Sequence, residues 1–95
     1  MAYTIGYRPE VDGDLEIIPR NMQARIKRAI EERLTVNPQA YGTRLTQSLS
    51  GLWKIRCGDY RIVYEMDERQ GTVTVWVICH RKQVYEIAEK RWGRE

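Results

Sequence analysis

Metal-ligating residues are few in this sequence, and their scarcity narrows the possible chemistry. The 95 residues include no phenylalanine, one histidine (His80) and two cysteines (Cys57 and Cys79). Neither cysteine lies in a CxxC or other metal-binding spacing, so we expect no metal site and no cofactor, and we interpret both thiols as core residues in a reducing compartment. No signal peptide opens the chain and no apolar run is long enough to span a bilayer, which predicts a cytoplasmic protein without a membrane partner.

The excess of positive charge is small as well. Sixteen lysines and arginines against thirteen acidic residues give a net charge of +3 and a pI near 9.0. This excess does not identify a nucleic-acid-binding protein by itself, but it is consistent with a polyanionic partner if the cations converge on one face. The length and a hydrophobic content of 42% suit a single domain, residues 1–95, with its own core.

Hydrophobic periodicity and turn residues predict an α+β fold. We expect a largely antiparallel sheet of four to five strands, two N-terminal helices packed on one face, and a short C-terminal helix. The clearest helix follows Pro19, where an apolar stripe at helical spacing runs to Leu34 and Arg33 interrupts it near its edge. The expected helices span residues 10–18, 19–36 and 82–92, and the expected strands span residues 2–8, 44–49, 52–57, 60–66 and 72–79.

One predicted β-hairpin carries the strongest functional signal. If Gly58-Asp59 is its turn, Arg56 lies directly opposite Arg61. Side-chain alternation then places Lys54 on the same face as both arginines. Two like charges about 5 Å apart repel by roughly 1 kcal/mol in water, and an anion between them would relieve the repulsion. The alternative is a solvated sheet face with splayed cations. The opposite, core face would carry Trp53, Ile55, Cys57, Tyr60, Ile62 and Tyr64.

A second basic group lies between the last strand and the C-terminal helix. It comprises His80, Arg81 and Lys82, and Tyr85 follows one helical turn beyond Arg81, so the two can share a helix face. Arginine binds phosphate bidentately, and tyrosine can stack on a base or transfer a proton. Structural interpretations stay open: a core-edge role for His80, helix packing for Tyr85, and solvated helix charges for Lys82, Lys90, Arg91 and Arg94.

The hairpin and the second basic group together resemble the RelE/ParE superfamily of type II toxins, and RelE-type toxins in particular. The stretch from Gly51 to Glu65 resembles the central RelE hairpin, and residues 80–85, His-Arg-Lys-Gln-Val-Tyr, resemble the family's HRKxVY segment. Residues 25–30 and the spacing of Asn37-Pro38, Gly42 and Leu45 match as well. Asp12-Gly13-Asp14 departs from the more regular first helix of the relatives, which leaves the regularity of that helix open.

The resemblance implies an RNA-cleaving enzyme. RelE-type toxins are ribosome-dependent mRNA endonucleases that cut the codon in the ribosomal A site and so inhibit translation. Their partners are the mRNA, the ribosome (the 16S rRNA region of the A site) and a cognate, RelB-like antitoxin, with which they form a hetero-oligomer. By motif position, the implied catalytic residues are Lys54, Arg61, Arg81 and Tyr85, and the implied RNA-binding residues are Arg56, His80 and Lys82.

The implied reaction is attack of a ribose 2′-hydroxyl on the adjacent phosphate, without a metal ion. We expect Arg61 and Arg81 to bind the phosphate, where negative charge develops in the transition state. Tyr85 and Lys54 are the candidates for proton transfer, with their order undecided, and His80 is a further alternative. Three alternatives remain: an RNase toxin that does not need the ribosome, a ParE-like toxin that inhibits DNA gyrase without nuclease activity, and an RNA-binding module without activity.

Overall fold

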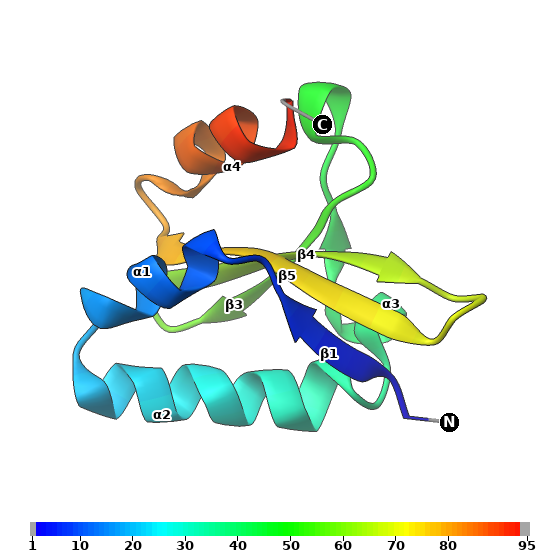
Figure 1. Ribbon diagram of the computed structural model, residues 1–95, viewed down its shortest axis with the longest axis horizontal. Helices are drawn as coiled ribbons and strands as arrows, with labels where there is room; N and C mark the ends of the chain where they lie inside the picture. The colour runs from blue at the N-terminus through cyan, green and yellow to red at the C-terminus, as the bar shows by residue number, and fades with distance from the viewer. Residues whose placement is uncertain (1, 94–95) are drawn as a thin grey trace.

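In the computed structural model, which describes residues 2–93, a five-stranded sheet carries helices on both faces (Figure 1). The strand order is β1-β5-β4-β3-β2, with β1 parallel to β5 and all other pairs antiparallel. The strands are β1 (Thr4–Tyr7), β2 (Thr43–Arg44), β3 (Trp53–Cys57), β4 (Tyr60–Asp67) and β5 (Thr72–His80). The helices are α1 (Glu10–Glu16), α2 (Arg20–Ala29), α3 (Pro38–Tyr41) and α4 (Val84–Trp92), with a π-helical turn at Ile30–Leu34 and a 3-10 turn at Gln47–Leu49. The α+β prediction is confirmed.

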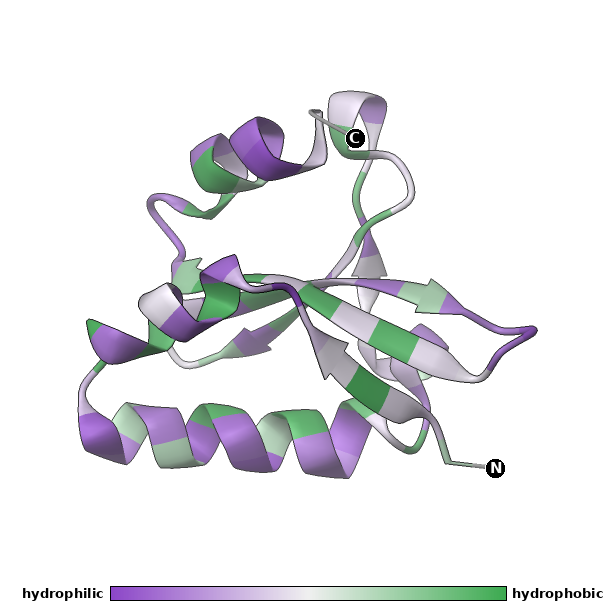
Figure 2. Ribbon diagram, in the orientation of Figure 1, coloured by the Kyte–Doolittle hydropathy of each residue, from purple (hydrophilic) through white to green (hydrophobic). Residues whose placement is uncertain are grey.

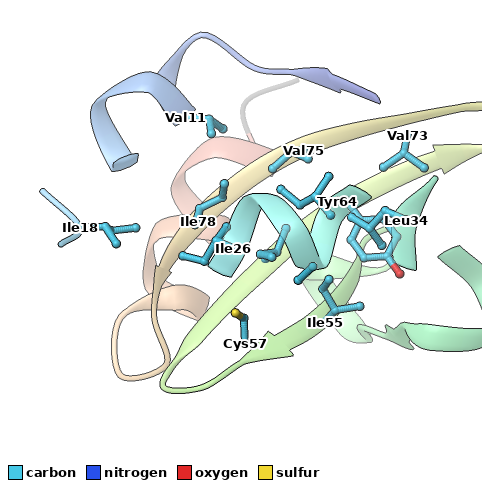
Figure 3. Packing of buried hydrophobic residues seen from close by; sticks show 13 residues of the cluster. Val11, Ile18, Ile26, Leu34, Ile55, Cys57, Tyr64, Val73, Val75 and Ile78 are labelled. Atoms are coloured by element: carbon cyan, nitrogen blue, oxygen red, sulfur yellow. The ribbon is translucent and has the colours of Figure 1, made fainter. Parts of the chain in front are cut away.

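Two clusters of buried side chains hold these layers together. In the first, α2 lies against the sheet, and Ile26 and Leu34 point toward Ile55, Tyr64 and strand β5 (Figure 3). The helix alternates hydrophilic and hydrophobic bands, as an amphipathic helix does (Figure 2). The second cluster lies on the other face of the sheet, which α4 covers. There Val84 and Ala88 of α4 pack with strand residues of β4 and β5, namely Val63, Trp76, Val77 and Cys79.

The predicted hairpin register is confirmed residue by residue. Cys57 pairs with Tyr60, Arg56 with Arg61, and Lys54 with Val63. Gly58 makes the turn possible with a φ of 61°, a conformation that glycine adopts without steric cost. The face predicted as core does contribute to the first cluster, so the cations lie on the opposite face of this hairpin.

Three segments differ from the expectations. The long helix ends in a π-helical turn, in which Thr35 N–H bonds the carbonyl of Ile30, five residues earlier. Residues 38–41, expected to be a connection, form α3, which the Asn37 side chain caps by accepting from Ala40 N–H. The strand predicted over 44–49 is wrong beyond Arg44. Because Leu45 N–H already bonds the carbonyl of Leu52, the residues between them must reverse the chain.

A buried ion pair joins α1, β5 and α4. The Arg91 guanidinium donates two hydrogen bonds of 2.8 Å to the carboxylate of Asp14 and one of 2.9 Å to the carbonyl of Trp76. Asp14 also accepts from the backbone N–H of Ile78, at a point where β1 no longer pairs with β5. The expectation that Arg91 is a solvated helix charge is therefore wrong, and the same expectation for Arg94 falls outside the described residues. The first helix is regular over Glu10–Glu16, and Asp14 is one of its buried residues.

Candidate functional site

The cations of the hairpin gather in one hollow at the edge of the sheet. It has a volume of about 330 Å³, and we call it the cationic hollow. Three of its lining cations come from the hairpin: Lys54, Arg56 and Arg61. The other side of the hollow is formed by Arg33 from the π-helical turn and Tyr41 from α3. No carboxylate lines it within the described part of the chain. The hollow thus has the electrostatic character of an anion-binding site.

Arg61 is held in place by the turn of the hairpin itself. Its Nη1 donates to the carbonyl of Gly58 at 3.1 Å and to that of Tyr60 at 3.0 Å. Both bonds run to backbone within three residues of Arg61, so the fold positions this half-buried guanidinium before any ligand binds. A preorganised cation is suited to stabilising the charge of a phosphoryl transition state.

Lys54 lies between the cationic hollow and a second hollow beneath α4. Its Nζ donates a 2.5 Å hydrogen bond to the hydroxyl oxygen of Tyr85. The distance from Nζ to the ring centre is 5.2 Å. The two distances differ by about the separation of the ring centre from its hydroxyl oxygen, so the ammonium lies beyond the hydroxyl and not over the ring face. The contact is therefore a hydrogen bond rather than a cation–π interaction. The second hollow, of about 490 Å³, also contains Glu86 and Glu89.

Tyr85 does not lie where a helix-packing residue would. Its side chain is 45% exposed, whereas the neighbouring Val84 and the later Ala88 are the buried residues of α4. Its hydroxyl accepts a hydrogen bond from Lys54 of β3. The structure therefore joins Tyr85 to Lys54, which lines the cationic hollow together with Arg56 and Arg61.

Arg81 lies at the turn end of the hairpin, near Arg61. Its backbone N–H bonds the carbonyl of Asp59 at 2.8 Å, and its exposed Nε is 3.8 Å from the Asp59 carboxylate. The sequence argument that Arg81 and Tyr85 share a helix face is wrong, because α4 begins only at Val84. The structure places Arg81 beside the turn and not among the residues that line the cationic hollow.

His80 and Lys82 take part in local structure. The His80 ring contacts Tyr60 edge-on, with centroids 5.8 Å apart, and its Nδ1 accepts from the backbone N–H of Lys82 at 3.2 Å. Tyr60 belongs to the face that packs toward α2, so His80 lies on the opposite side of the sheet from Arg61. Lys82 is exposed in the turn that precedes α4.

Sequence reasoning missed Arg33 and Tyr41. The interruption of the apolar helical stripe at Arg33 was a signal, and its cause is now visible, because Arg33 reaches the edge of the sheet and donates to the carbonyl of Arg56 at 3.0 Å. Tyr41 gave no signal, since its segment was expected to be a connection. Within residues 2–93, no three His, Cys, Asp or Glu side chains lie close enough to hold a metal ion. None of the helices in that range combines the length and the apolar character needed to cross a bilayer.

Comparison with known proteins identifies the family. Residues 5–85 match the family model described as the ParE toxin of the type II toxin–antitoxin system parDE. The chain belongs to the RelE/ParE superfamily of type II toxins. Toxin RelG of Mycobacterium tuberculosis is 28% identical over 85 residues, which cover 90% of this chain and 98% of that protein. Toxin RelE of the same organism is 32% identical over 74 residues, covering 78% and 76% of the two chains.

Solved structures of superfamily members share the fold. The toxin–antitoxin complex RelBE2 of M. tuberculosis aligns with a TM-score of 0.81 and 27% identity, over 85% of this chain and 100% of that chain. A mutant of Escherichia coli toxin RelE in the free state aligns with a TM-score of 0.74 and 22% identity, over 96% and 98% of the two chains. In the superfamily member described here, the matched residues 5–85 include the hairpin, Arg81 and Tyr85.

Proposed function

We propose that this toxin is a metal-independent endoribonuclease that cleaves mRNA in the ribosomal A site and thereby inhibits translation. The observation that carries the proposal is the meeting of Lys54, Arg56 and Arg61 in one hollow, with the Tyr85 hydroxyl bonded to Lys54 at its rim. Folding alone does not favour three neighbouring cations without an acid among them. A phosphodiester in the hollow would compensate their charge.

In the proposed reaction, the ribose 2′-oxygen forms a bond to the adjacent phosphorus while the bond from phosphorus to the 5′-oxygen of the next nucleotide breaks. The products are a 2′,3′-cyclic phosphate and a free 5′-hydroxyl. Arg61 and Arg56 bind the non-bridging oxygens, and Arg81 approaches from the turn. The proton of the 2′-hydroxyl leaves to solvent water as the new bond to phosphorus forms. Because Lys54 donates to the Tyr85 oxygen, the phenolic proton is directed away from Lys54 and can pass to the leaving 5′-oxygen. The Lys54 ammonium stabilises the phenolate that forms, and solvent water returns a proton to Tyr85 before the next turnover.

Such a site is a weak catalyst of proton transfer, since it uses neither a carboxylate pair nor a histidine pair. Its rate must depend on how well the substrate is positioned. This weakness supports dependence on the ribosome, which would hold the codon in a fixed geometry. The relatives named RelE and RelG support the same assignment.

We also propose that a cognate, RelB-like antitoxin binds this chain in a hetero-oligomer. The M. tuberculosis RelBE2 structure, which shares the fold at 27% identity, is a toxin–antitoxin complex. A second candidate function, inhibition of DNA gyrase without RNA cleavage, is favoured by one finding, which is that the matching family model describes ParE toxins.

The test is cleavage of a short mRNA, with and without programmed 70S ribosomes. We expect cleavage in the A-site codon only with ribosomes, a loss of roughly 10²–10³-fold in rate for Arg61→Gln, and a loss of roughly 10²–10⁴-fold for Tyr85→Phe. Arg28→Gln is the matched control, because Arg28 is an exposed arginine of α2, which covers the other face of the sheet.

The other outcomes separate the alternatives. Cleavage of naked mRNA at the same rate would replace ribosome dependence with a ribosome-independent activity. Absence of cleavage in both conditions, together with retained toxicity in cells, would refute the nuclease assignment and direct the experiment to DNA gyrase.

A further inference from the structure

The cationic hollow extends past the residues that the proposed reaction uses. Lys54, Arg56 and Arg61 form its sheet side, while Arg33 from the π-helical turn and Tyr41 from α3 form a second side. A scissile phosphate near Lys54 and Tyr85 would leave this second side for a neighbouring part of the substrate. The whole hollow, of about 330 Å³, lies at the lower end of the range typical of small-molecule sites, which suits one nucleotide.

Arg33 is fixed at the edge of β3. Strand β2 pairs with β3 only through Thr43–Lys54 and Arg44–Trp53, so the carbonyl of Arg56 lies beyond the end of β2. The π-helical turn carries Arg33 to this carbonyl, which accepts a 3.0 Å hydrogen bond from its Nη1. Single π-helical turns are often found at functional sites. A guanidinium has five N–H donors, so this bond orients Arg33 and leaves donors for an anion.

Tyr41 is an exposed aromatic residue on a rigid support. Its side chain is 55% exposed at the end of α3. The buried Tyr64 hydroxyl donates a 2.6 Å hydrogen bond to the carbonyl of Pro38, at the start of the same short helix. Gly42 follows directly, and a Cβ there would lie 1.8 Å from the Tyr64 hydroxyl, so the backbone beside Tyr41 packs tightly on the core.

We propose that Arg33 and Tyr41 form a nucleotide subsite for single-stranded RNA. A base stacks on Tyr41, and Arg33 binds a phosphate next to the scissile one. Aromatic residues beside cationic grooves are the usual means of binding unpaired bases. The inference rests on the proposed nuclease function. It assigns to this chain a contact with the RNA outside the atoms that react.

Binding of a five-nucleotide RNA, carrying a fluorescent label and a 2′-O-methyl group at each position to prevent cleavage, tests the subsite by anisotropy. We expect Tyr41→Ala to weaken binding roughly ten-fold, and Tyr41→Phe, which keeps the ring, to bind like the original chain. Arg33→Met should weaken binding and lower the slope of log affinity against log salt by about 0.7. Tyr7→Ala is the matched control, since Tyr7 is an exposed tyrosine on β1, at the other edge of the sheet.

An abasic scan locates the stacked base. Removing one particular base should cost the original chain about as much as Tyr41→Ala does, and should cost the Tyr41→Ala chain nothing further. Equal affinity of Tyr41→Ala and the original chain, a loss shared by Tyr7→Ala, or an absence of binding by the original chain would each overturn the subsite. So would selective loss of antitoxin binding in Tyr41→Ala, which would make this side of the hollow a protein contact.

Ribosome-programmed cleavage by the original chain, measured in parallel, keeps the two proposals apart. Normal cleavage with no effect of Tyr41→Ala on RNA affinity refutes the subsite alone. Tyr41-dependent RNA affinity without any cleavage refutes the nuclease function and leaves the RNA-binding surface.

Discussion

The ion pair between Asp14 and Arg91 offers the sharpest test of how this fold holds its C-terminal helix. Replacing Arg91 by methionine keeps an apolar stem of similar length and removes the guanidinium. The Asp14 carboxylate, whose side chain is only 10% exposed, then loses two hydrogen bonds of 2.8 Å and keeps the one from the Ile78 N–H. The carbonyl of Trp76 also loses its bond from Arg91.

The expected cost follows from burial. Breaking a fully buried pair by removing one partner costs about 3–5 kcal/mol. Here the Arg91 side chain is 18% exposed, so water can partly solvate the remaining carboxylate. We therefore expect Arg91→Met to lower the free energy of unfolding by about 2–4 kcal/mol. For a chain of this size each kcal/mol corresponds to about 4–8 °C in Tm, so the melting temperature should fall by roughly 8–32 °C.

Urea and thermal unfolding of four chains would measure this: the original, Arg91→Met, Asp14→Asn and the double variant. The two residues contact each other directly, so the cycle should show a coupling of about 1–3 kcal/mol, with the double variant more stable than the sum of the single losses predicts. Lys90→Met is the matched control, because Lys90 is the exposed residue next to Arg91 on α4. Losses of unfolding free energy below about 0.5 kcal/mol, or losses that add without coupling, would show that the ion pair does not hold α4 to α1 and β5.

Two further predictions concern tight packing and pH. A Cβ at Gly42 would meet the Tyr64 hydroxyl at 1.8 Å, so Gly42→Ala should cost about 2–3 kcal/mol in urea unfolding. Tyr64→Phe, which removes the hydroxyl, should reduce that cost. Gly13→Ala is the control, because a Cβ there meets nothing within 4 Å, and it should stabilise α1. Equal effects of Gly42→Ala and Gly13→Ala on the free energy of unfolding would refute the clash. Burial, reinforced by Asp14 and opposed by Arg91, raises the pKa of the Cys79 thiol from 9.0 to about 11. The folded chain thus keeps this proton longer than the unfolded chain, so stability should be unaffected by Cys79 below pH 9 and should fall by up to about 2–3 kcal/mol between pH 9 and 11. Cys79→Ala should show a smaller fall over the same range, and an identical fall would contradict the assignment.

Local patterns were sufficient for the central part of the molecule. The Gly58-Asp59 turn and strict alternation determine which residues of β3 and β4 face each other, so the opposition of Arg56 and Arg61 was predictable from a two-residue loop. The apolar stripe before Leu34 likewise identified α2 and its buried face. The errors fell where chain reversal or capping decides the structure, at residues 38–41 and 45–49, because such segments have no hydrophobic period to read.

Contacts between distant segments were beyond the reach of these patterns. Asp14 and Arg91 are 77 residues apart, and each by itself resembles a surface charge. Arg33 meets Arg56 across 23 residues, and only the shortness of β2 leaves that carbonyl accessible to it. Side-chain chemistry and short-range periodicity can be read directly from the sequence. They were enough to predict an α+β toxin fold with a cationic hairpin. The sequence does not tell that Arg91 enters a buried ion pair while Arg33 lines the hollow. These roles depend on desolvation and hydrogen bonding, which arise only when the helices pack on the sheet.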